Sequence, residues 1–173
     1  MKLIKIILTT LLLLFSFQTN LFSEIRYVDF KYILNESKAG KEAQNYLKKE
    51  LENGIKSLKK KEKAIQDEEK KIIQQKKLIK PEEYKKQVSQ LREKVSSLQT
   101  QRNKLLDNIA KKRAKARTTL LKTLNPIIKD YMQEKKIRLV LDKKSILLAD
   151  QNLEITSKII EILNKELKSI KLK

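Results

Sequence analysis

The sequence predicts a mainly α protein in which a long antiparallel helical hairpin, a coiled-coil arm, projects from a small β body. Three observations lead to this fold class. The 173 residues include only two Gly and two Pro, and 36% of them are charged, which is typical of long helices. Apolar residues recur at heptad spacing through the middle of the chain. Strand-like segments flank that stretch, and such short strands are expected to complete a barrel or sheet only by oligomerisation.

The first 23 residues have the three parts of a secretory signal peptide. Lys2 and Lys5 make a basic start, residues 6–17 are an apolar run, and a cleavage site near Ser23 follows. The run is shorter than the about 20 residues of a membrane span, and an uncleaved anchor is the alternative. We predict export to the periplasm, where a chain without cysteine needs no disulfide.

The first body segment is predicted over residues 24–37. Residues 25–30 alternate in polarity and favour a strand. Residues 32–37 predict a short helical turn, and Ser37 is expected to cap the helix that follows.

The arm is predicted over residues 38–125. In its first helix, to about residue 79, one heptad seam is apolar throughout and the second becomes polar toward the end. The apolar seam consists of Leu51, Leu58, Ile65, Ile72 and Ile79. Gly54 interrupts this helix at a cost of about 1 kcal/mol relative to Ala, either as a hinge or as a tolerated substitution.

The second arm helix is predicted from about residue 82, where apolar residues alternate spacings of three and four. The stripe consists of Tyr84, Val88, Leu91, Val95, Leu98, Arg102, Leu105, Ile109, Lys112 and Ala116, with Arg102 and Lys112 as its basic members. The stripe broadens at residues 120–131, where the rod is expected to enter a packed body. Pro126 is predicted to kink or restart the helix there.

The last body segment is predicted over residues 126–173 as a helix end, two strands and a terminal helix. The strands are residues 137–142 and 145–150, joined as a hairpin through Lys143 and Lys144. Thr156 is the predicted N-cap of the final helix, with Ile155 and Ile160 as a hydrophobic staple.

Pro81 could kink a rod, mark a linker or turn the chain back. A straight rod of about 95 residues would separate its ends by about 140 Å, whereas a turn at Lys80 and Pro81 lets the terminal strands meet. Proline is favoured at the first helical position. In the resulting register, facing residue numbers sum to about 160, and we predict a contact between Glu62 and Arg102.

Composition argues against an enzyme and against a bound cofactor or metal. The chain has no Cys, His or Trp, which removes thiol nucleophiles, imidazole bases and the usual zinc ligands. Glycine occurs only at positions 40 and 54, so a glycine-rich phosphate loop is excluded.

The net charge of +20 has two interpretations: an anionic partner, or solvation of an exposed helix. Arginine, which dominates specific base recognition, is scarce, so a specific nucleic-acid site is not expected. One basic cluster could bind anionic lipid headgroups or lipopolysaccharide, or could be a solvated helix face. Its residues are Lys111, Lys112, Arg113, Lys115 and Arg117.

Two terminal motifs, "VDFKYILNESKAGKEAQ" (28–44) and "LVLDKKSILLADQNLEITSKIIEIL" (139–163), resemble the Skp/OmpH family of periplasmic chaperones. The resemblance covers essentially the whole chain after residue 23. The matching residues are Val28, Asp29, Ile33, Leu34, Ser37, Gly40, Val140, Leu141, Asp142, Ala149, Asp150, Ile155 and Thr156.

The resemblance implies a homotrimer with a central β-barrel body and three helical arms around a cavity. It implies an ATP-independent holdase that keeps unfolded outer-membrane proteins soluble. Candidate body and oligomer residues are Val28, Ile33, Leu34, Val140, Leu141, Ile146 and Leu148. The alternatives are a basic coiled-coil structural protein, one that binds nucleic acid or anionic lipid, and a membrane-anchored stalk.

Overall fold

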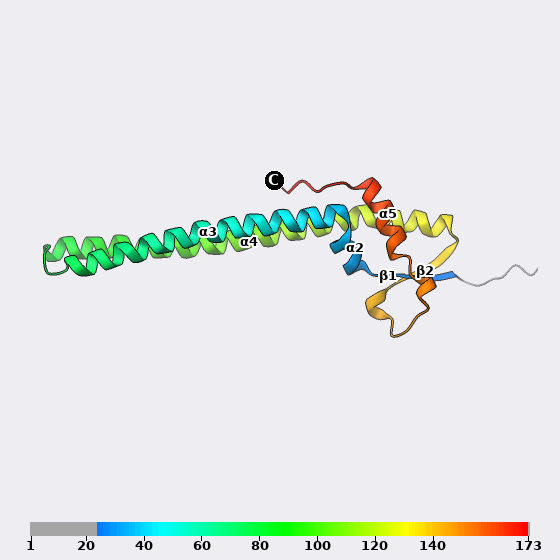
Figure 1. Ribbon diagram of the computed structural model, residues 1–173, viewed down its shortest axis with the longest axis horizontal. Helices are drawn as coiled ribbons and strands as arrows, with labels where there is room; N and C mark the ends of the chain where they lie inside the picture. Colours follow the sequence, from blue (N-terminus) through cyan, green and yellow to red (C-terminus); the bar gives the residue numbers. More distant parts are fainter. Residues whose placement is uncertain (1–23, 173) are drawn as a thin grey trace, which may run out of the picture.

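The computed structural model describes residues 24–172, which form a small body and one long helical arm (Figure 1). The predicted signal peptide lies outside the described residues. The elements are β1 (Glu24–Val28), α2 (Phe30–Glu36), α3 (Lys38–Gln75), α4 (Pro81–Glu134), β2 (Ile137–Asp142), the 3-10 helices η1 (Lys143–Ser145) and η2 (Gln151–Leu153), and α5 (Thr156–Glu166). The predicted fold class, mainly helical with a small sheet, is confirmed.

The tip of the arm lies between α3 and α4. Pro81 is the first residue of α4, and Lys80 before it has an extended backbone with φ −64° and ψ 146°, as expected for a residue that precedes proline. The turn is therefore where the sequence predicts it. However, α3 ends at Gln75 rather than near residue 80. Leu78 is 82% exposed, so no packing supports a further helical turn there.

The two arm helices pack in the predicted antiparallel register. Leu47, Leu58 and Ile72 of α3, and Leu98 and Ile109 of α4, are buried along the seam. Cross-helix ion pairs join Glu68 to Lys94 at 2.6 Å and Glu50 to Lys112 at 2.7 Å. The predicted pair also meets, with Arg102 Nη2 3.7 Å from Glu62 Oε2. All three pairs have residue numbers that sum to 162 or 164, close to the predicted 160.

The sheet has two strands and is parallel. Ile25 lies opposite Leu139 and Val28 opposite Asp142, with the whole arm as the crossover that a parallel pair requires. The predicted second strand over residues 145–150 is wrong for the single chain. The Asp142 carboxylate accepts from the Lys144 amide at 3.2 Å and starts η1, so the chain turns away instead of forming a hairpin.

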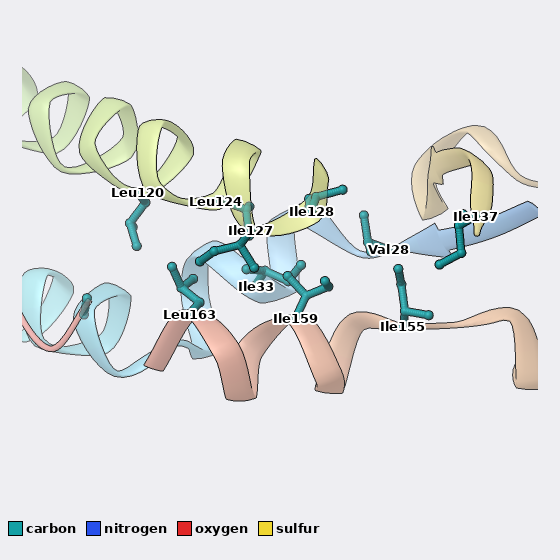
Figure 2. Close-up of a cluster of buried hydrophobic side chains, with 11 residues drawn as sticks. Val28, Ile33, Leu120, Leu124, Ile127, Ile128, Ile137, Ile155, Ile159 and Leu163 are labelled. Carbon is teal, nitrogen blue, oxygen red and sulfur yellow. The ribbon is translucent and has the colours of Figure 1, made fainter. Parts of the chain in front are cut away.

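The core of the body gathers side chains from β1, α2, α4, β2 and α5 (Figure 2). Ile33, Leu124, Ile159 and Leu163 are fully buried in it. Helix α4 continues through Pro126 without restarting. The buried residues on both sides of the proline bind this stretch to the core, which offsets the lost backbone hydrogen bond.

Thr156 is not the N-cap of α5, as predicted, but its first helical residue. Its hydroxyl accepts from the Asp29 amide at 2.9 Å and donates to Glu154 Oε1 at 2.7 Å. Ile155 occupies the cap position without a side-chain hydrogen bond. The predicted staple pair, Ile155 and Ile160, both join the core of the body. The threonine instead joins the two terminal segments of the body.

Ser37 caps α3 as predicted, with its hydroxyl accepting from the Gly40 amide at 3.2 Å. A Cβ on Gly40 would collide with the backbone carbonyl oxygen of Leu34. Gly54 is neither a hinge nor a merely tolerated substitution. A Cβ there would lie 2.5 Å from Leu105 Cδ2, so Gly54 makes room for Leu105 across the arm.

We expect Gly40→Ala to lower the free energy of unfolding by about 1–3 kcal/mol, because an overpacked site must shift the backbone. Urea denaturation measures the change. Gly54→Ala is the matched control, since only the flexible Leu105 side chain opposes the new methyl group and the helix gains about 1 kcal/mol from alanine. A Gly40→Ala protein as stable as Gly54→Ala would contradict this account of the α2–α3 junction.

Candidate functional surfaces

The outer surface of the arm is basic, with isolated apolar side chains. A shallow groove on α3 is lined by Ile55, its one apolar residue, together with Glu52, Lys56, Lys59, Lys60 and Lys63. Elsewhere on the arm, Ile73, Val95 and Leu106 are each more than half exposed. Such a surface offers many weak contacts rather than one strong binding pocket.

The basic cluster that the sequence singled out does not form one face. Lys111 and Lys115 lie four residues apart on α4, as do Arg113 and Arg117, but the two pairs point to different sides of the helix. Lys111 pairs with Asp107 at 2.7 Å. Within residues 24–172, no acidic side chain pairs with Arg113, Lys115 or Arg117.

Lys112 was predicted to belong to that basic cluster, but its side chain is largely buried between the two arm helices. Its ammonium donates to both carboxylate oxygens of Glu50, at 2.7 and 2.9 Å, and lies 5.4 Å from the centre of the Tyr46 ring. The hydrogen bond to Glu50 raises the pKa of Lys112, against the lowering effect of burial. This half-buried network links α3 to α4, and the Lys112 ammonium is engaged within the arm rather than on a common surface with the rest of the cluster.

The body exposes an apolar surface around the two-stranded sheet. Ile25, Leu139 and Leu141 are 43%, 45% and 37% exposed, and Leu147 and Leu148 in the following loop are 96% and 90% exposed. Within residues 24–172, β2 has one edge without a strand partner, whereas the outer edge of β1 is bridged at Tyr27 by Glu154. Open edges beside exposed leucines are features of a surface that another chain covers.

The predicted body residues divide into two groups. Val28 and Ile33 are fully buried within one chain, and Leu34 and Val140 pack against the same core. Leu141 and Leu148 face solvent, and Ile146 is half-buried. The first group therefore builds the body of a single chain, and only the second is available to a neighbouring chain.

The loop between β2 and α5 is anchored at Glu154. Its carboxylate accepts from Lys143 Nζ at 3.0 Å and from the Thr156 hydroxyl at 2.7 Å. Next to it, the Ile155 amide donates to the Tyr27 carbonyl at 3.0 Å. Burial alone would raise the pKa of Glu154, but the Thr156 and Lys143 hydrogen bonds outweigh burial and lower it from 4.5.

We expect acid to loosen this loop. Because folding lowers the pKa of Glu154, its ionised form stabilises the fold at neutral pH, and this contribution is lost as the pH falls through the folded-state pKa. Between about pH 5 and pH 3, Glu154→Gln should therefore lose less unfolding free energy than the wild type. Urea denaturation at both pH values tests this. Glu93→Gln, an exposed arm carboxylate, should keep the wild-type difference.

Two features were missed by sequence reasoning. One is the packing of Leu105 against Gly54. A heptad pattern does not reveal it, because the pattern is read from apolar side chains and glycine has none. The other is the segment after α5, where Ile170 and Leu172 pack against the root of the arm. Its signal in the sequence is the alternation of apolar and polar residues from 169 to 172.

Among the described residues, no three acidic side chains come together as metal ligands. Over the same range, no helix is long and apolar enough to cross a membrane.

Comparison with known families decides the identity of this fold. The family model described as outer membrane protein (OmpH-like) matches residues 24–163. The chain belongs to the OmpH-like family. This OmpH-like protein is also similar in structure to a chain from Caulobacter crescentus CB15, described as an OmpH-like outer membrane chaperone, with a TM-score of 0.80.

The two structures share 20% sequence identity, and the match covers 86% of this chain and 88% of the Caulobacter chain. The comparison with curated protein sequences gives no match. At this identity the structural likeness establishes the fold alone. The family membership supports a chaperone as the class of function of this OmpH-like protein.

Proposed function

We propose that this protein is an ATP-independent periplasmic holdase, neither an enzyme nor a cofactor-binding protein. Its arm binds unfolded outer-membrane proteins and prevents their aggregation. The observation that carries the proposal is the arm itself: a basic hairpin with apolar side chains exposed singly along its length, including the Ile55 groove. An unfolded chain can bind such a surface at many weak points and still be released.

The proposal includes assembly of three chains through the body. Leu147 and Leu148 are exposed, and within residues 24–172 the outer edge of β2 has no strand partner. A neighbouring chain would cover both the leucines and this edge. Three such bodies would hold three arms around a common cavity. The arms would then enclose a client that each arm alone binds weakly.

The test is the refolding of an outer-membrane β-barrel protein diluted from urea. Light scattering should fall to baseline at about one trimer per client, and capture should slow when salt is raised to about 0.5 M, because salt screens the long-range attraction. Aggregation that continues at this ratio would overturn the holdase proposal. Capture that salt does not affect would remove the electrostatic part of it.

Variants can locate the contribution of charge. Lys59→Glu with Lys63→Glu reverses two lysines of the Ile55 groove and should slow client capture several-fold. Lys158→Glu with Lys165→Glu makes the same change in net charge on α5, in the body. This matched control should retain capture closer to the wild type.

A second candidate function is binding to anionic lipid or lipopolysaccharide. It is supported by Arg113 and Arg117, which share one side of α4 and have no acidic partner within residues 24–172. Flotation with vesicles containing anionic lipid tests it. Arg113→Glu with Arg117→Glu should abolish binding if these residues form the site, and binding unchanged by this pair would remove the candidate.

A further inference from the structure

The segment after α5, which we call the tail (residues 167–172), runs back along the root of the arm (Figure 1). Leu172 at its end is only 4% exposed. It packs against the root cluster, which consists of Ala43 and Leu47 of α3 and Ile109 and Ala116 of α4. Ile170 contacts both this cluster and the core of the body. The tail therefore covers apolar surface at the place where the arm joins the body.

The tail is held by these side chains and not by its backbone. The last backbone hydrogen bond recorded toward the C-terminus joins the Leu167 amide to the Leu163 carbonyl at 2.8 Å. Within residues 24–172, no hydrogen bond to the backbone of residues 168–172 is formed. A segment attached in this way can leave without breaking any ladder of hydrogen bonds.

The last four residues of the tail alternate in polarity, as a membrane β-strand does over about ten residues. Ile170 and Leu172 face the protein, whereas Ser169 and Lys171 are exposed. Alternation of apolar and polar residues along an extended chain is the pattern of strands in outer-membrane barrels. The tail thus places alternate apolar side chains against the root cluster, as an extended segment of an unfolded barrel protein would.

Charge disfavours the tail as an occupant of this site. The tail carries Lys168 and Lys171, and its Leu172 shares a cluster with Ile109 and Ala116 of α4, the stretch that also carries Arg113, Lys115 and Arg117. None of these three has an acidic partner within residues 24–172. An extended segment with acidic neighbours would bind the same apolar surface with attraction in place of repulsion.

We propose that the root cluster is a client-binding site for extended segments with alternating apolar residues and acidic flanks, and that the tail is its intramolecular competitor. The inference rests on the proposed function, which supplies the client class. When the tail is docked, the site is blocked. The apparent affinity for a client segment is therefore the intrinsic affinity multiplied by the fraction of molecules in which the site is free. Return of the tail helps to expel a client segment.

The test uses the full chain and a labelled peptide in which apolar residues alternate with polar ones between acidic ends. In the tail-release variant, Ile170→Ser with Leu172→Ser, the peptide should bind about tenfold more tightly if the tail occupies the site in about nine-tenths of molecules. The control, Ser169→Ala with Lys171→Arg, changes only exposed tail positions and should bind as the wild type does. Fluorescence anisotropy measures both affinities.

A second variant fixes the tail in place. The chain has no cysteine, so Ala116→Cys with Leu172→Cys allows a single cross-link, by a disulfide or a short thiol-reactive linker. Cross-linking should weaken peptide binding, and cleavage of the link should restore it. A peptide of the same composition with its apolar residues grouped together should bind no better to the tail-release variant than to the wild type.

An unchanged affinity in the tail-release variant, with circular dichroism like that of the wild type, would overturn the inference. A change in oligomer size without a change in peptide affinity would assign the root cluster to contact between copies of the chain and would also overturn it. Failure of the proposed function looks different, because then neither the wild type nor the tail-release variant suppresses aggregation of the barrel protein.

Discussion

Leu124→Ala is expected to lower the free energy of unfolding by about 2–5 kcal/mol, since it removes buried methyl groups and leaves a cavity. Leu124 of α4 has no exposed surface. It lies in the core between α4, α2 and α5, near Ile33 and Leu163 (Figure 2), so neighbouring elements cannot all move in to fill the space. Loss on this scale is a large fraction of the stability of a typical domain.

Urea denaturation at a fixed protomer concentration measures this change, because oligomerisation would make stability depend on concentration. Leu78→Ala is the matched control. Leu78 lies at the tip of the arm and is 82% exposed, so the same truncation should change stability by less than about 0.5 kcal/mol. Equal effects at the two sites would mean that the body core contributes no more to stability than the tip does.

If the body assembles as proposed, Leu147→Asp combined with Leu148→Asp is expected to leave the protein monomeric. Both side chains are at least 90% exposed in the single chain, so the substitutions remove no contact within it. In an assembly, each leucine would lose about 1.5–3 kcal/mol of burial, and each carboxylate would have to be buried without a partner. The oligomer should therefore fail while the monomer keeps its fold.

Sedimentation gives the mass, circular dichroism gives the helix content, and the refolding assay gives the activity. We expect the mass of one chain, wild-type helix content and a large loss of aggregation suppression. The control Leu78→Asp places a carboxylate on another highly exposed leucine, at the arm tip, and should keep the wild-type mass. A double variant that still sediments as the wild type would show that the leucine loop is not part of the interface.

The arm was largely predictable from the sequence. Heptad periodicity depends on local spacing, and Pro81 marks the start of α4 through its own covalent geometry. The Glu62–Arg102 contact then followed from counting residues outward from the tip. Ser37 was predictable for the same reason, because a helix cap is a local interaction.

The predictions that were wrong depended on partners distant in sequence. Residues 145–150 have the composition of a strand, but a strand needs an adjacent edge, and in the single chain the loop turns at η1 instead. Thr156 has the chemistry of a cap, but its hydroxyl is used by Asp29, 127 residues away. Lys112 was placed on a surface patch, although Glu50 and Tyr46 of the opposite helix draw it into the arm.

The sequence by itself thus determined the arm, its turning point and its register, since these follow from local periodicity and from one proline. Only the tertiary structure decided which basic residues face solvent, why Gly54 lies opposite Leu105, and where the tail packs. Those features depend on the side chains that the fold-back brings together. No spacing along a single helix can specify them, because the contacts form between segments that are far apart in the chain.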